Sequence, residues 1–415
     1  MSRATSNGRS SHITAPRRRK GARGKFAFIA LVSVIVFAGA FVLLWSLGSV
    51  IVGGKGFPWT ATADAAVSPV ALQAQVDHPL EPLVDLRAFR DLSYVPVKGI
   101  YVTSYAAGRP APLAKMIAIA DQTEINAFVI DIKDDQGKIV YDADVPLAKS
   151  LGLIAVHIPD IDGLIATLRE HNITPIARLI TFQDSALAEA RPDLAVQSTK
   201  GGIWRDIKGM GYTNPYNHEV WEYQVQVAED AARHGFREIQ FDYVRFPSDG
   251  VLAEAVYPGV YSTKEDAIAG FLGYARERLE KLGVWVSADV FGLSTTVKKD
   301  SGIGQQFEKI SQNVDVICPM VYPSHYDAGA YGIDSPNASP YELVTHAMKD
   351  AIPRLVGTGA MARPWIQDFS IGGVGYGVDQ VKAQIKAAEE LGFKEWLLWD
   401  PSLKYTVGAL RSQGG

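Results

Sequence analysis

The feature that most constrains the fold is a regular alternation of short apolar segments with amphipathic ones after residue 96. The apolar segments are rich in β-branched and aromatic side chains, which is typical of strands. They number eight and occupy residues 97–104, 126–133, 174–181, 238–246, 284–291, 314–322, 363–370 and 394–401. Their almost continuous apolar character indicates parallel strands covered by helices.

The segments between them show helical periodicity, clearest at 162–171, 218–235, 265–283 and 378–392. Several end in glycine, a common residue just after a helix. Eight strands that alternate with helices predict an α/β fold, a (β/α)8 TIM barrel, over residues 96–415. A doubly wound sheet is the alternative. It is less favoured because the glycine-rich segments 302–306 and 372–377 lack the spacing of a dinucleotide-binding loop.

The chain before the predicted barrel divides into three parts. Residues 1–25 form a basic tail, 26–52 contain no charged residue, and 53–95 have the composition of a linker. A 27-residue uncharged segment is long enough to cross a bilayer as a single transmembrane helix. The preceding lysines and arginines predict a cytoplasmic N-terminus and an extracytoplasmic barrel, in a single-pass protein of the cell membrane that contacts the lipid bilayer through 26–52. A cleaved export signal is the alternative.

Charge is distributed unevenly along the chain. The formal net charge is -4, but residues 1–25 hold eight of the 41 basic residues and none of the 45 acidic ones. The remainder therefore has 33 basic and 45 acidic residues, which argues against a nucleic-acid partner. The single cysteine, Cys318, excludes an internal disulfide and is expected to be a small core residue.

Polar residues gather at the predicted C-terminal ends of the strands, where barrel enzymes form their sites. Five of these strand ends carry carboxylates. Asp242 and Asp289 are two of these carboxylates. The candidate substrate-binding residues at the same rim are Tyr105, Asp131, Lys133, Arg178, Tyr243, Arg245, Tyr322, His325, Gln367, Asp368, Trp399 and Asp400. A structural network of these acids with Arg178 and Arg245 is the alternative interpretation.

Carboxylates beside aromatic side chains favour carbohydrate chemistry. Glycoside hydrolysis needs one carboxylic acid to protonate the leaving oxygen and a second carboxylate to attack carbon or activate water. The sequence has no metal-binding histidine motif and no nucleophile elbow, so neither a metal nor another cofactor is predicted.

Several motifs resemble the glycoside hydrolase-like barrel family long classed as a domain of unknown function. The most specific is "FDYVRFPSDG" at 241–250. The others lie at 99–108, 128–142, 212–217, 287–292 and 318–326. The resemblance covers about residues 95–405. It implies a barrel distantly similar to the alpha-amylase-like hydrolases, often tethered by an N-terminal membrane segment.

The alpha-amylase-like pattern implies roles for three residues. Asp242 occupies the place of the nucleophile, and Asp289 stands where that pattern has a glutamic acid/base. The family resemblance therefore implies that Asp242 and Asp289 are the catalytic residues. Asp368 lies near the place of the stabilising aspartate. The pattern also has an arginine two residues before the nucleophile, where this chain has Gln240. Arg245 follows Asp242 by three residues, and strand alternation would put it on the opposite face.

The leading hypothesis is a membrane-anchored glycoside hydrolase that acts on a cell-envelope or extracellular polysaccharide. The first alternative is a catalytically inactive barrel that binds the same kind of glycan. The second is a barrel enzyme of another class, such as an esterase or deacetylase. The sequence does not identify the sugar, the linkage or the stereochemical outcome.

Overall fold

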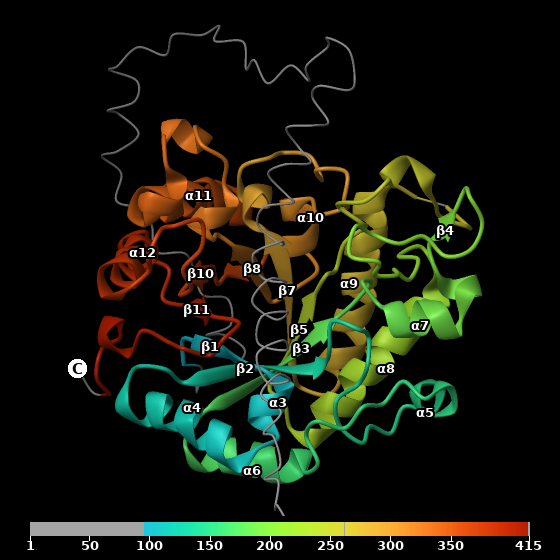
Figure 1. Cartoon of the computed structure of the whole chain (residues 1–415), viewed down its shortest axis with the longest axis horizontal. Helices are drawn as coiled ribbons and strands as arrows, with labels where there is room; N and C mark the ends of the chain where they lie inside the picture. The colour runs from blue at the N-terminus through green and yellow to red at the C-terminus, as the bar shows by residue number, and fades with distance from the viewer. Residues whose placement is uncertain (1–94, 261, 414–415) are drawn as a thin grey trace, which may run out of the picture. The chain divides into compact units, whose positions relative to one another are not determined.

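The predicted strands pair side by side in sequence order and close into a parallel barrel (Figure 1). The structure, a computed structural model, describes residues 95–260 and 262–413. The barrel strands are β1 (Lys98–Val102), β2 (Ala127–Lys133), β3 (Thr174–Ile180), β5 (Glu238–Asp242), β7 (Trp285–Phe291), β8 (Val316–Met320), β9 (Met361–Ala362) with β10 (Trp365–Gln367), and β11 (Trp396–Trp399). The pairings of β11 with β1 and of β10 with β8 complete the ring. The predicted (β/α)8 barrel is therefore confirmed.

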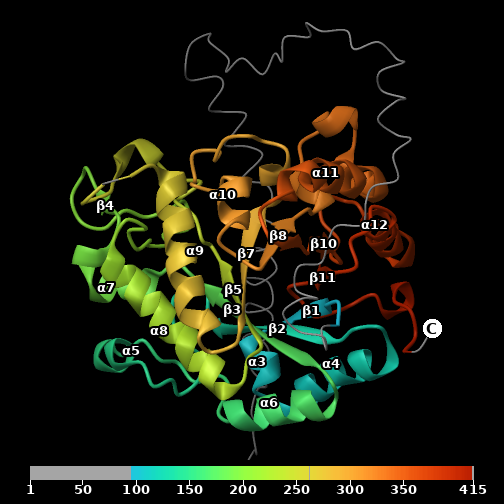
Figure 2. The same ribbon diagram turned by 180° about the vertical axis from the view of Figure 1, so that it is seen from behind.

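Helices surround the barrel on its outside, as the views from the front and from behind both show (Figures 1 and 2). The longer ones are α4 (Pro110–Gln122), α6 (Ile161–Glu170), α8 (His218–His234), α9 (Lys264–Glu280), α11 (Pro340–Leu355) and α12 (Val378–Glu390). Short helices α3 (Ser104–Ala107), α5 (Pro146–Leu151), α7 (Ser185–Ala190) and α10 (Phe307–Ser311) lie in the connections. The four predicted helical segments are confirmed within a few residues.

Local sequence signals set the ends of α8. The Asn217 side chain accepts a hydrogen bond from the amide of Glu219 (2.8 Å), which satisfies a free donor of the first turn. At the other end Gly235 adopts φ 104°, a left-handed conformation that glycine adopts without steric cost. The helix therefore begins just after Asn217 and ends just before Gly235.

The barrel interior is a small apolar core, separate from the larger core between strands and helices. Val129, Ile176, Cys318 and Leu397 belong to this interior cluster and are fully buried. The predicted place of Cys318 in the core is confirmed, and its thiol is free.

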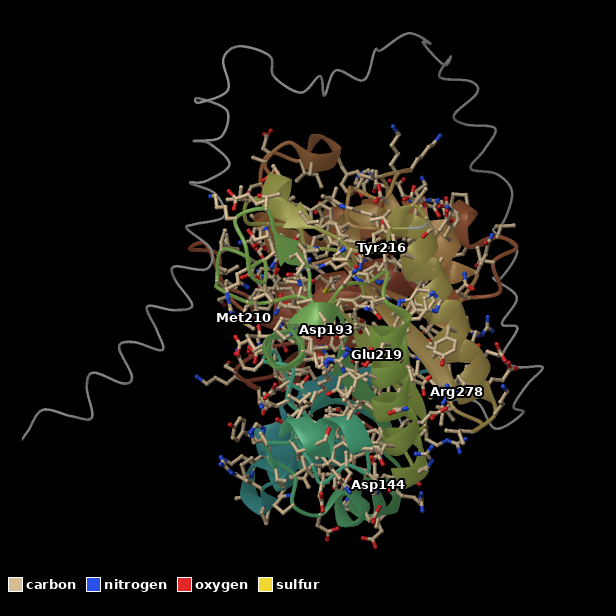
Figure 3. All side chains as sticks on the ribbon, turned by 90° about the vertical axis from the view of Figure 1, so that its right-hand side faces the viewer. Asp144, Asp193, Met210, Tyr216, Glu219 and Arg278 are labelled. Atoms are coloured by element: carbon tan, nitrogen blue, oxygen red, sulfur yellow. The ribbon has the colours of Figure 1, made fainter. Side chains whose placement is uncertain are left out.

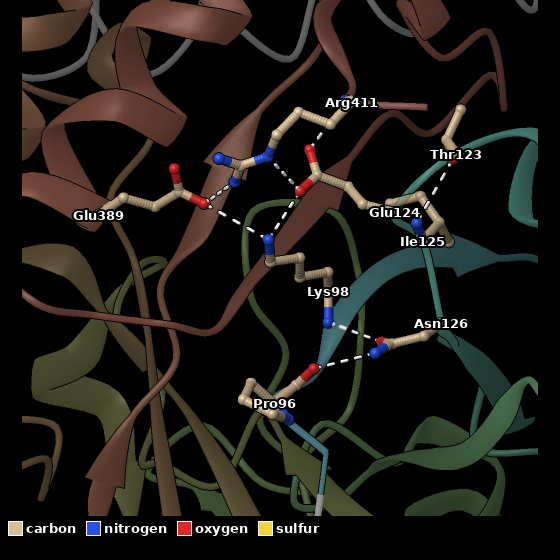
Figure 4. A network of polar contacts seen from close by, with 8 residues as sticks. All are labelled: Pro96, Lys98, Thr123, Glu124, Ile125, Asn126, Glu389 and Arg411. Carbon is tan, nitrogen blue, oxygen red and sulfur yellow. Dashed lines mark hydrogen bonds and ion pairs between the residues drawn. The ribbon is translucent and has the colours of Figure 1, made fainter. Parts of the chain in front are cut away.

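Ion pairs close the amino-terminal end of the barrel. Inside it, Arg363 donates to Glu238 (2.8 Å) and to Glu395 (3.2 Å). On the outer surface, the Lys98 ammonium lies 2.6 Å from Glu124, which also pairs with Arg411 near the end of the described chain (Figure 4). These contacts join β1 to the C-terminal segment and hold the end of the barrel opposite the predicted site.

Two predicted strands end differently in the structure. The fourth, predicted over 238–246, stops at Asp242 because Tyr243 adopts φ 49°, which no regular strand allows. The seventh, predicted over 363–370, is two short strands, β9 and β10, separated at Arg363 and Pro364. Proline has no amide hydrogen for the ladder, so it interrupts the strand.

The connections after β3 and β5 pair with each other beyond the barrel. They form a two-stranded antiparallel sheet from β4 (Gln197–Ser198) and β6 (Ala255–Val256). The first connection is tied back to α8 where Arg191 pairs with Asp193 (2.6 Å) and Glu219 (2.8 Å), two acids that lie close together in Figure 3. These two long connections therefore form one ordered layer next to β3 and β5.

The predicted tail, transmembrane segment and linker, at 1–25, 26–52 and 53–95, lie outside the described residues except for Val95. Within residues 95–260 and 262–413, no helix combines the length and apolar character of a membrane span.

Candidate active site

Four neighbouring strands each contribute one charged side chain at their carboxyl ends. Asp131 comes from β2, Arg178 from β3, Asp242 from β5 and Asp289 from β7. Their exposed fractions lie between 1% and 8%, so all four are buried. The structure thus brings four of the predicted site residues together.

Arg178 bridges two of the carboxylates. Its Nη1 donates to Asp131 Oδ1 (2.6 Å), and its Nε and Nη2 both donate to Asp242 Oδ2 (3.0 and 2.5 Å). In the sheet Arg178 pairs with Gln240. The arginine therefore lies at the level that the alpha-amylase-like pattern expects, but on the adjacent strand. Arg245 is not its substitute.

Aromatic rings cover the Arg178–Asp131 pair. The Tyr101 hydroxyl donates to Asp131 Oδ2 (2.5 Å), and its ring stacks on Trp399 with centroids 4.2 Å apart. The Arg178 guanidinium lies 5.6 Å from the Tyr101 ring and 5.2 Å from the Trp399 ring. The Arg178 guanidinium is therefore held by cation–π contacts with Tyr101 and Trp399 as well as by its hydrogen bonds to the two carboxylates.

Asp289 has a different environment from Asp242. Its Oδ1 accepts a hydrogen bond from the indole of Trp365 (2.7 Å), and within the described chain it pairs with no cation. Burial, and then the neighbouring charge of Asp242, raise the pKa of Asp289 well above its usual value. Asp289 is therefore a carboxylic acid suited to donate a proton.

The register of β5 and β7 places the two candidate catalytic acids side by side. Gln240 pairs with Ser287 and Phe241 with Ala288, so Asp242 and Asp289 follow at the next position of each strand. Adjacent strands lie about 4.8 Å apart. The two carboxyl groups thus project from neighbouring backbone positions at the carboxyl end of the barrel.

Tyr322 lies beside both acids. It follows β8, is 7% exposed, and contacts the rings of His325 and Phe369 at centroid distances of 5.3 and 5.8 Å. Burial and the charges of Asp289 and Asp242 raise the pKa of its hydroxyl well above the usual value. Tyr322 is therefore a neutral hydrogen-bonding group next to the acid pair, with His325 further out and exposed.

Tyr243 and Arg245 lie on the loop that leaves β5. The amide of Tyr243 donates to Asp242 Oδ1 (2.6 Å). The Arg245 guanidinium lies 5.0 Å from the Tyr243 ring and 4.9 Å from the Phe291 ring. Because the strand ends at Asp242, strand alternation does not govern where Arg245 points.

Lys133 faces away from this group, contrary to its assignment as a substrate-binding residue. Its ammonium pairs with Asp184 (2.6 Å) and donates to Gln224 of α8 (3.1 Å), and the side chain is fully buried. A bulge in β2 is the reason: Asp131 pairs with Arg178, but Lys133 pairs with the next residue, Leu179. The bulge turns Lys133 toward the helices.

Gln367 and Asp400 are both held by hydrogen bonds within the fold, and their role in substrate binding stays a prediction. Gln367 is fully buried, and its backbone bonds to Gln384 of α12 while its side chain donates to Phe369. Asp400 accepts from the amides of Ser402 (2.7 Å) and Lys404 (3.1 Å). Both residues shape the loops at the rim.

Asp368 and Tyr105 have partners outside the acid group. Asp368 accepts from the amide and the hydroxyl of Thr406 (2.8 and 2.6 Å), and burial raises the pKa of Asp368 to about 6. Tyr105 is 51% exposed and stacks on His157 with centroids 3.8 Å apart. The structure shows no contact of either residue with Asp242 or Asp289 within the described chain.

Two residues of the site were absent from the sequence prediction, namely Tyr101 and Trp365. Both lie in apolar segments and fit the pattern of core residues. Each lies two residues from a polar residue near the end of a predicted strand, Thr103 in 97–104 and Gln367 in 363–370. That spacing was the available signal, because alternate residues of a strand share one face.

The described residues contain no group of three or more histidine, cysteine or acidic side chains arranged to hold a metal. What the arrangement provides instead is an acid with a raised pKa beside a carboxylate that is hydrogen-bonded to an arginine. In such a pair the protonated acid can donate a proton, and the carboxylate can attack the substrate or activate a water molecule.

Comparison with known proteins agrees with this chemistry. The model of a family described as "Putative glycosyl hydrolase domain" matches residues 99–405. No curated protein matches the chain. Among solved structures, a hypothetical protein from Ruminiclostridium thermocellum ATCC 27405 is 38% identical, over 46% of this chain and 97% of its own, with a TM-score of 0.43.

The glycoside hydrolase domain of PgaB (BpsB) from Bordetella bronchiseptica shares the barrel fold. It is 12% identical, over 76% of this chain and 99% of its own, with a TM-score of 0.57. The family model spans nearly all of the barrel, including the four strand ends that carry the acids and Arg178. The chain therefore belongs to this family of glycosyl hydrolase domains.

Proposed function

We propose that the protein is a membrane-anchored glycoside hydrolase of a cell-envelope or extracellular polysaccharide. The observation that carries the proposal is the contrast between two neighbouring acids. Asp289 is buried with a raised pKa, whereas Asp242 accepts three hydrogen bonds, two of them from Arg178. A pair of carboxyl groups in such different environments divides into an acid and a nucleophile or base.

In the first step, Asp289 donates its proton to the glycosidic oxygen and the leaving sugar departs. Asp242 attacks the anomeric carbon in the same step and forms a glycosyl ester. In the second step the Asp289 carboxylate takes a proton from water, which displaces Asp242 and releases the sugar. The neighbouring register of the two residues favours this retaining route, which uses carboxyl groups about 5–5.5 Å apart, over inversion.

Arg178 has a positioning role in this scheme. It holds one oxygen of Asp242 and, through Asp131 and Tyr101, is itself fixed on the side away from Asp289. A nucleophile that is already oriented avoids an entropic cost at the moment of attack.

The second candidate function is a barrel that binds glycan without cleaving it. The ion pair of Asp242 with Arg178 is the observation in its favour, since a carboxylate held by arginine is a poorer nucleophile. The absence of any such pair at Asp289 within the described residues favours catalysis instead.

The membrane anchor rests on the uncharged segment 26–52 and the basic residues before it. Fractionation of cells that express the full chain tests it, with protease added outside intact cells. The anchor predicts a membrane-bound protein whose barrel is cleaved from outside. Release of the full-length protein into the soluble fraction contradicts it.

The catalytic proposal is tested with the full chain in detergent, assayed for release of reducing ends from a panel of envelope and extracellular glycans. Hydrolysis is expected to fall at least 1,000-fold, an order-of-magnitude figure for loss of a nucleophile, in Asp242→Asn and strongly in Asp289→Asn. Hydrolysis by Asp242→Asn at the parent rate would exclude the assignment. Binding of a glycan by both proteins without cleavage by the parent would favour the second candidate.

A further inference from the structure

Arg245 is a buried cation with few partners. Its side chain is 5% exposed, and its guanidinium lies between the rings of Tyr243 and Phe291. Its one hydrogen bond in the described chain runs from Nη1 to the carbonyl of Phe246 (3.1 Å). A guanidinium has five N–H donors, so most of its capacity is unused.

No acid pairs with Arg245 among residues 95–260 and 262–413, although acids are near. Arg178, the other buried arginine of the rim, takes two carboxylates. Asp206 Oδ1 accepts from the amides of Lys208 and Met210, and Asp249 Oδ1 accepts from the amide of Ile207. Neither acid forms an ion pair with Arg245 in the described part of the chain. A buried charge without a counter-ion is costly, which points to a partner that arrives from outside.

The position of Arg245 is next to the catalytic pair. It is separated from Asp242 by Tyr243 and Val244, and Phe291 follows Asp289 by two residues on β7. Tyr243 adjoins both residues, because its amide donates to Asp242 Oδ1 (2.6 Å) and its ring lies 5.0 Å from the Arg245 guanidinium. A sugar bound at the acids would therefore reach Arg245 with a substituent or with the adjoining ring.

The guanidinium carbon of Arg245 lies over the rings of both Tyr243 and Phe291. An arginine held in this way keeps its planar edge oriented, and that edge matches the two oxygens of a carboxylate or phosphate. A sugar hydroxyl needs neither the charge nor the fork. The chemistry that fits the edge is therefore an anion.

We propose that Arg245 binds an anionic substituent, a carboxylate or a phosphate, of the glycan held at Asp242 and Asp289. The inference rests on the proposed glycoside hydrolase function and gives its substrate class: an acidic polysaccharide, such as one that contains uronic acids. The negative balance of the barrel does not oppose this, because the two arginines Arg178 and Arg245 together match the charges of Asp131 and Asp242 at the site.

The test measures binding by ligand-observed NMR to the full-length Asp242→Asn protein in detergent, so that no substrate is consumed. The probes are matched monosaccharides: glucose, glucuronate and glucose 6-phosphate, and galactose with galacturonate. The acidic member of a pair is expected to bind at least about tenfold more tightly, a difference typical of a charge-assisted bidentate contact. The uronate and phosphate probes separate the two sources of the anion.

Arg245→Gln, made in the same background, should bind the acidic and neutral members equally. Arg245→Lys retains the charge without the fork and should keep only part of the preference. Arg205→Gln is the matched control. Arg205 lies on the connection after β3, is exposed, and pairs with Glu189 (3.0 Å), so its loss should leave the preference unchanged.

Equal binding of acidic and neutral probes by the parent overturns the inference, and so does a preference that survives in Arg245→Gln with the melting temperature unchanged. If Arg245→Gln unfolds, the binding of acidic and neutral probes is compared in Arg245→Lys instead, and an undiminished preference there overturns the inference. Cleavage of neutral glycans without any anion preference removes only this inference. An anion preference in a protein whose hydrolysis survives Asp242→Asn removes the proposed catalytic role instead.

Discussion

Arg178 and Asp242 form the central contact of the site, in which Nε and Nη2 of the arginine converge on one carboxylate oxygen at 3.0 and 2.5 Å. The third guanidinium nitrogen, Nη1, donates to Asp131 on the other side. One buried cation thus pairs with two buried acids. The arrangement is sensitive to removal of the cation, because a buried charge is tolerated only while its partner is present.

Arg178→Gln should therefore destabilise the barrel and abolish hydrolysis. Loss of one member of a buried ion pair costs about 3–5 kcal/mol, and here two acids lose their partner. The free energy of unfolding from urea titration, followed by tryptophan fluorescence, measures the effect. Arg191→Gln is the control, since its pairs with Asp193 and Glu219 are largely exposed and contribute about 0–1 kcal/mol. Equal losses in the two variants would contradict the central role of Arg178.

Asp289→Asn should inactivate the protein and yet stabilise it at neutral pH. Burial raises the pKa of Asp289 in the folded state, so the folded protein binds a proton that the unfolded chain releases above its usual value of 3.8. The contribution of Asp289 to the free energy of unfolding is therefore largest below pH 3.8. It is lost as the pH rises from there toward the raised pKa of Asp289 in the folded state. Asparagine carries no charge, so the variant avoids this loss.

Urea midpoints at several pH values measure the difference between parent and Asp289→Asn. The difference should be small near pH 4 and grow as the pH rises to 8. Asp144→Asn is the control, because Asp144 is exposed (Figure 3) and its pairing with Lys149 lowers the pKa of Asp144. A midpoint difference for Asp289→Asn that does not change with pH would show that Asp289 is ionised in the folded protein.

Much of the fold follows from local patterns in the sequence. Apolar segments of strand length and glycine-terminated amphipathic segments are sufficient to predict the barrel, because both depend on near neighbours. The carboxyl-end positions of Asp131, Arg178, Asp242 and Asp289 follow from the same alternation. Which side chain meets which depends on register between strands, and that cannot be read from one strand alone.

Lys133 and Arg178 show where the prediction from sequence ends. A bulge in β2 turns Lys133 from the interior to the helix layer, and no sequence signal marks the bulge. Arg178 reaches Asp242 from the neighbouring strand, so a search of the strand that carries Asp242 misses it. Both outcomes are set by contacts between residues distant in the chain.

Cys318 should not react with thiol reagents until the barrel unfolds. It is fully buried in the interior, where Gln240 donates to its sulfur (3.3 Å), and burial raises the pKa of the thiol well above its usual value. Both effects suppress the reactive thiolate. Labelling with a chromogenic disulfide in native buffer should be slower by several orders of magnitude than in denaturant, and fast labelling of the native protein would show that the interior opens.

Trp365→Phe should raise the pKa of Asp289 further and move the alkaline limb of the pH–activity profile upward. The indole N–H donates to Asp289 Oδ1 (2.7 Å), and a bond of this kind favours the ionised carboxylate. Its loss also frees the orientation of the acid, so the plateau rate should fall by about tenfold, the equivalent of one hydrogen bond of about 1–1.5 kcal/mol. The pH profile on a cleaved glycan measures both effects, and carboxyl-carbon NMR of Asp289 follows its titration without a substrate.

Trp396→Phe is the control for this change, because it makes the same substitution at a buried tryptophan whose indole does not bond to the acid. Trp396 is also fully buried, but in the described structure its Nε1 has no hydrogen-bond acceptor, and its ring lies in the core shared with the helices. The two variants therefore lose similar volume, and only one loses a bond to the acid. A shift of the alkaline limb in Trp365→Phe alone supports the role of Asp289 as the proton donor. The same shift in both variants would assign it to a general loosening of the barrel.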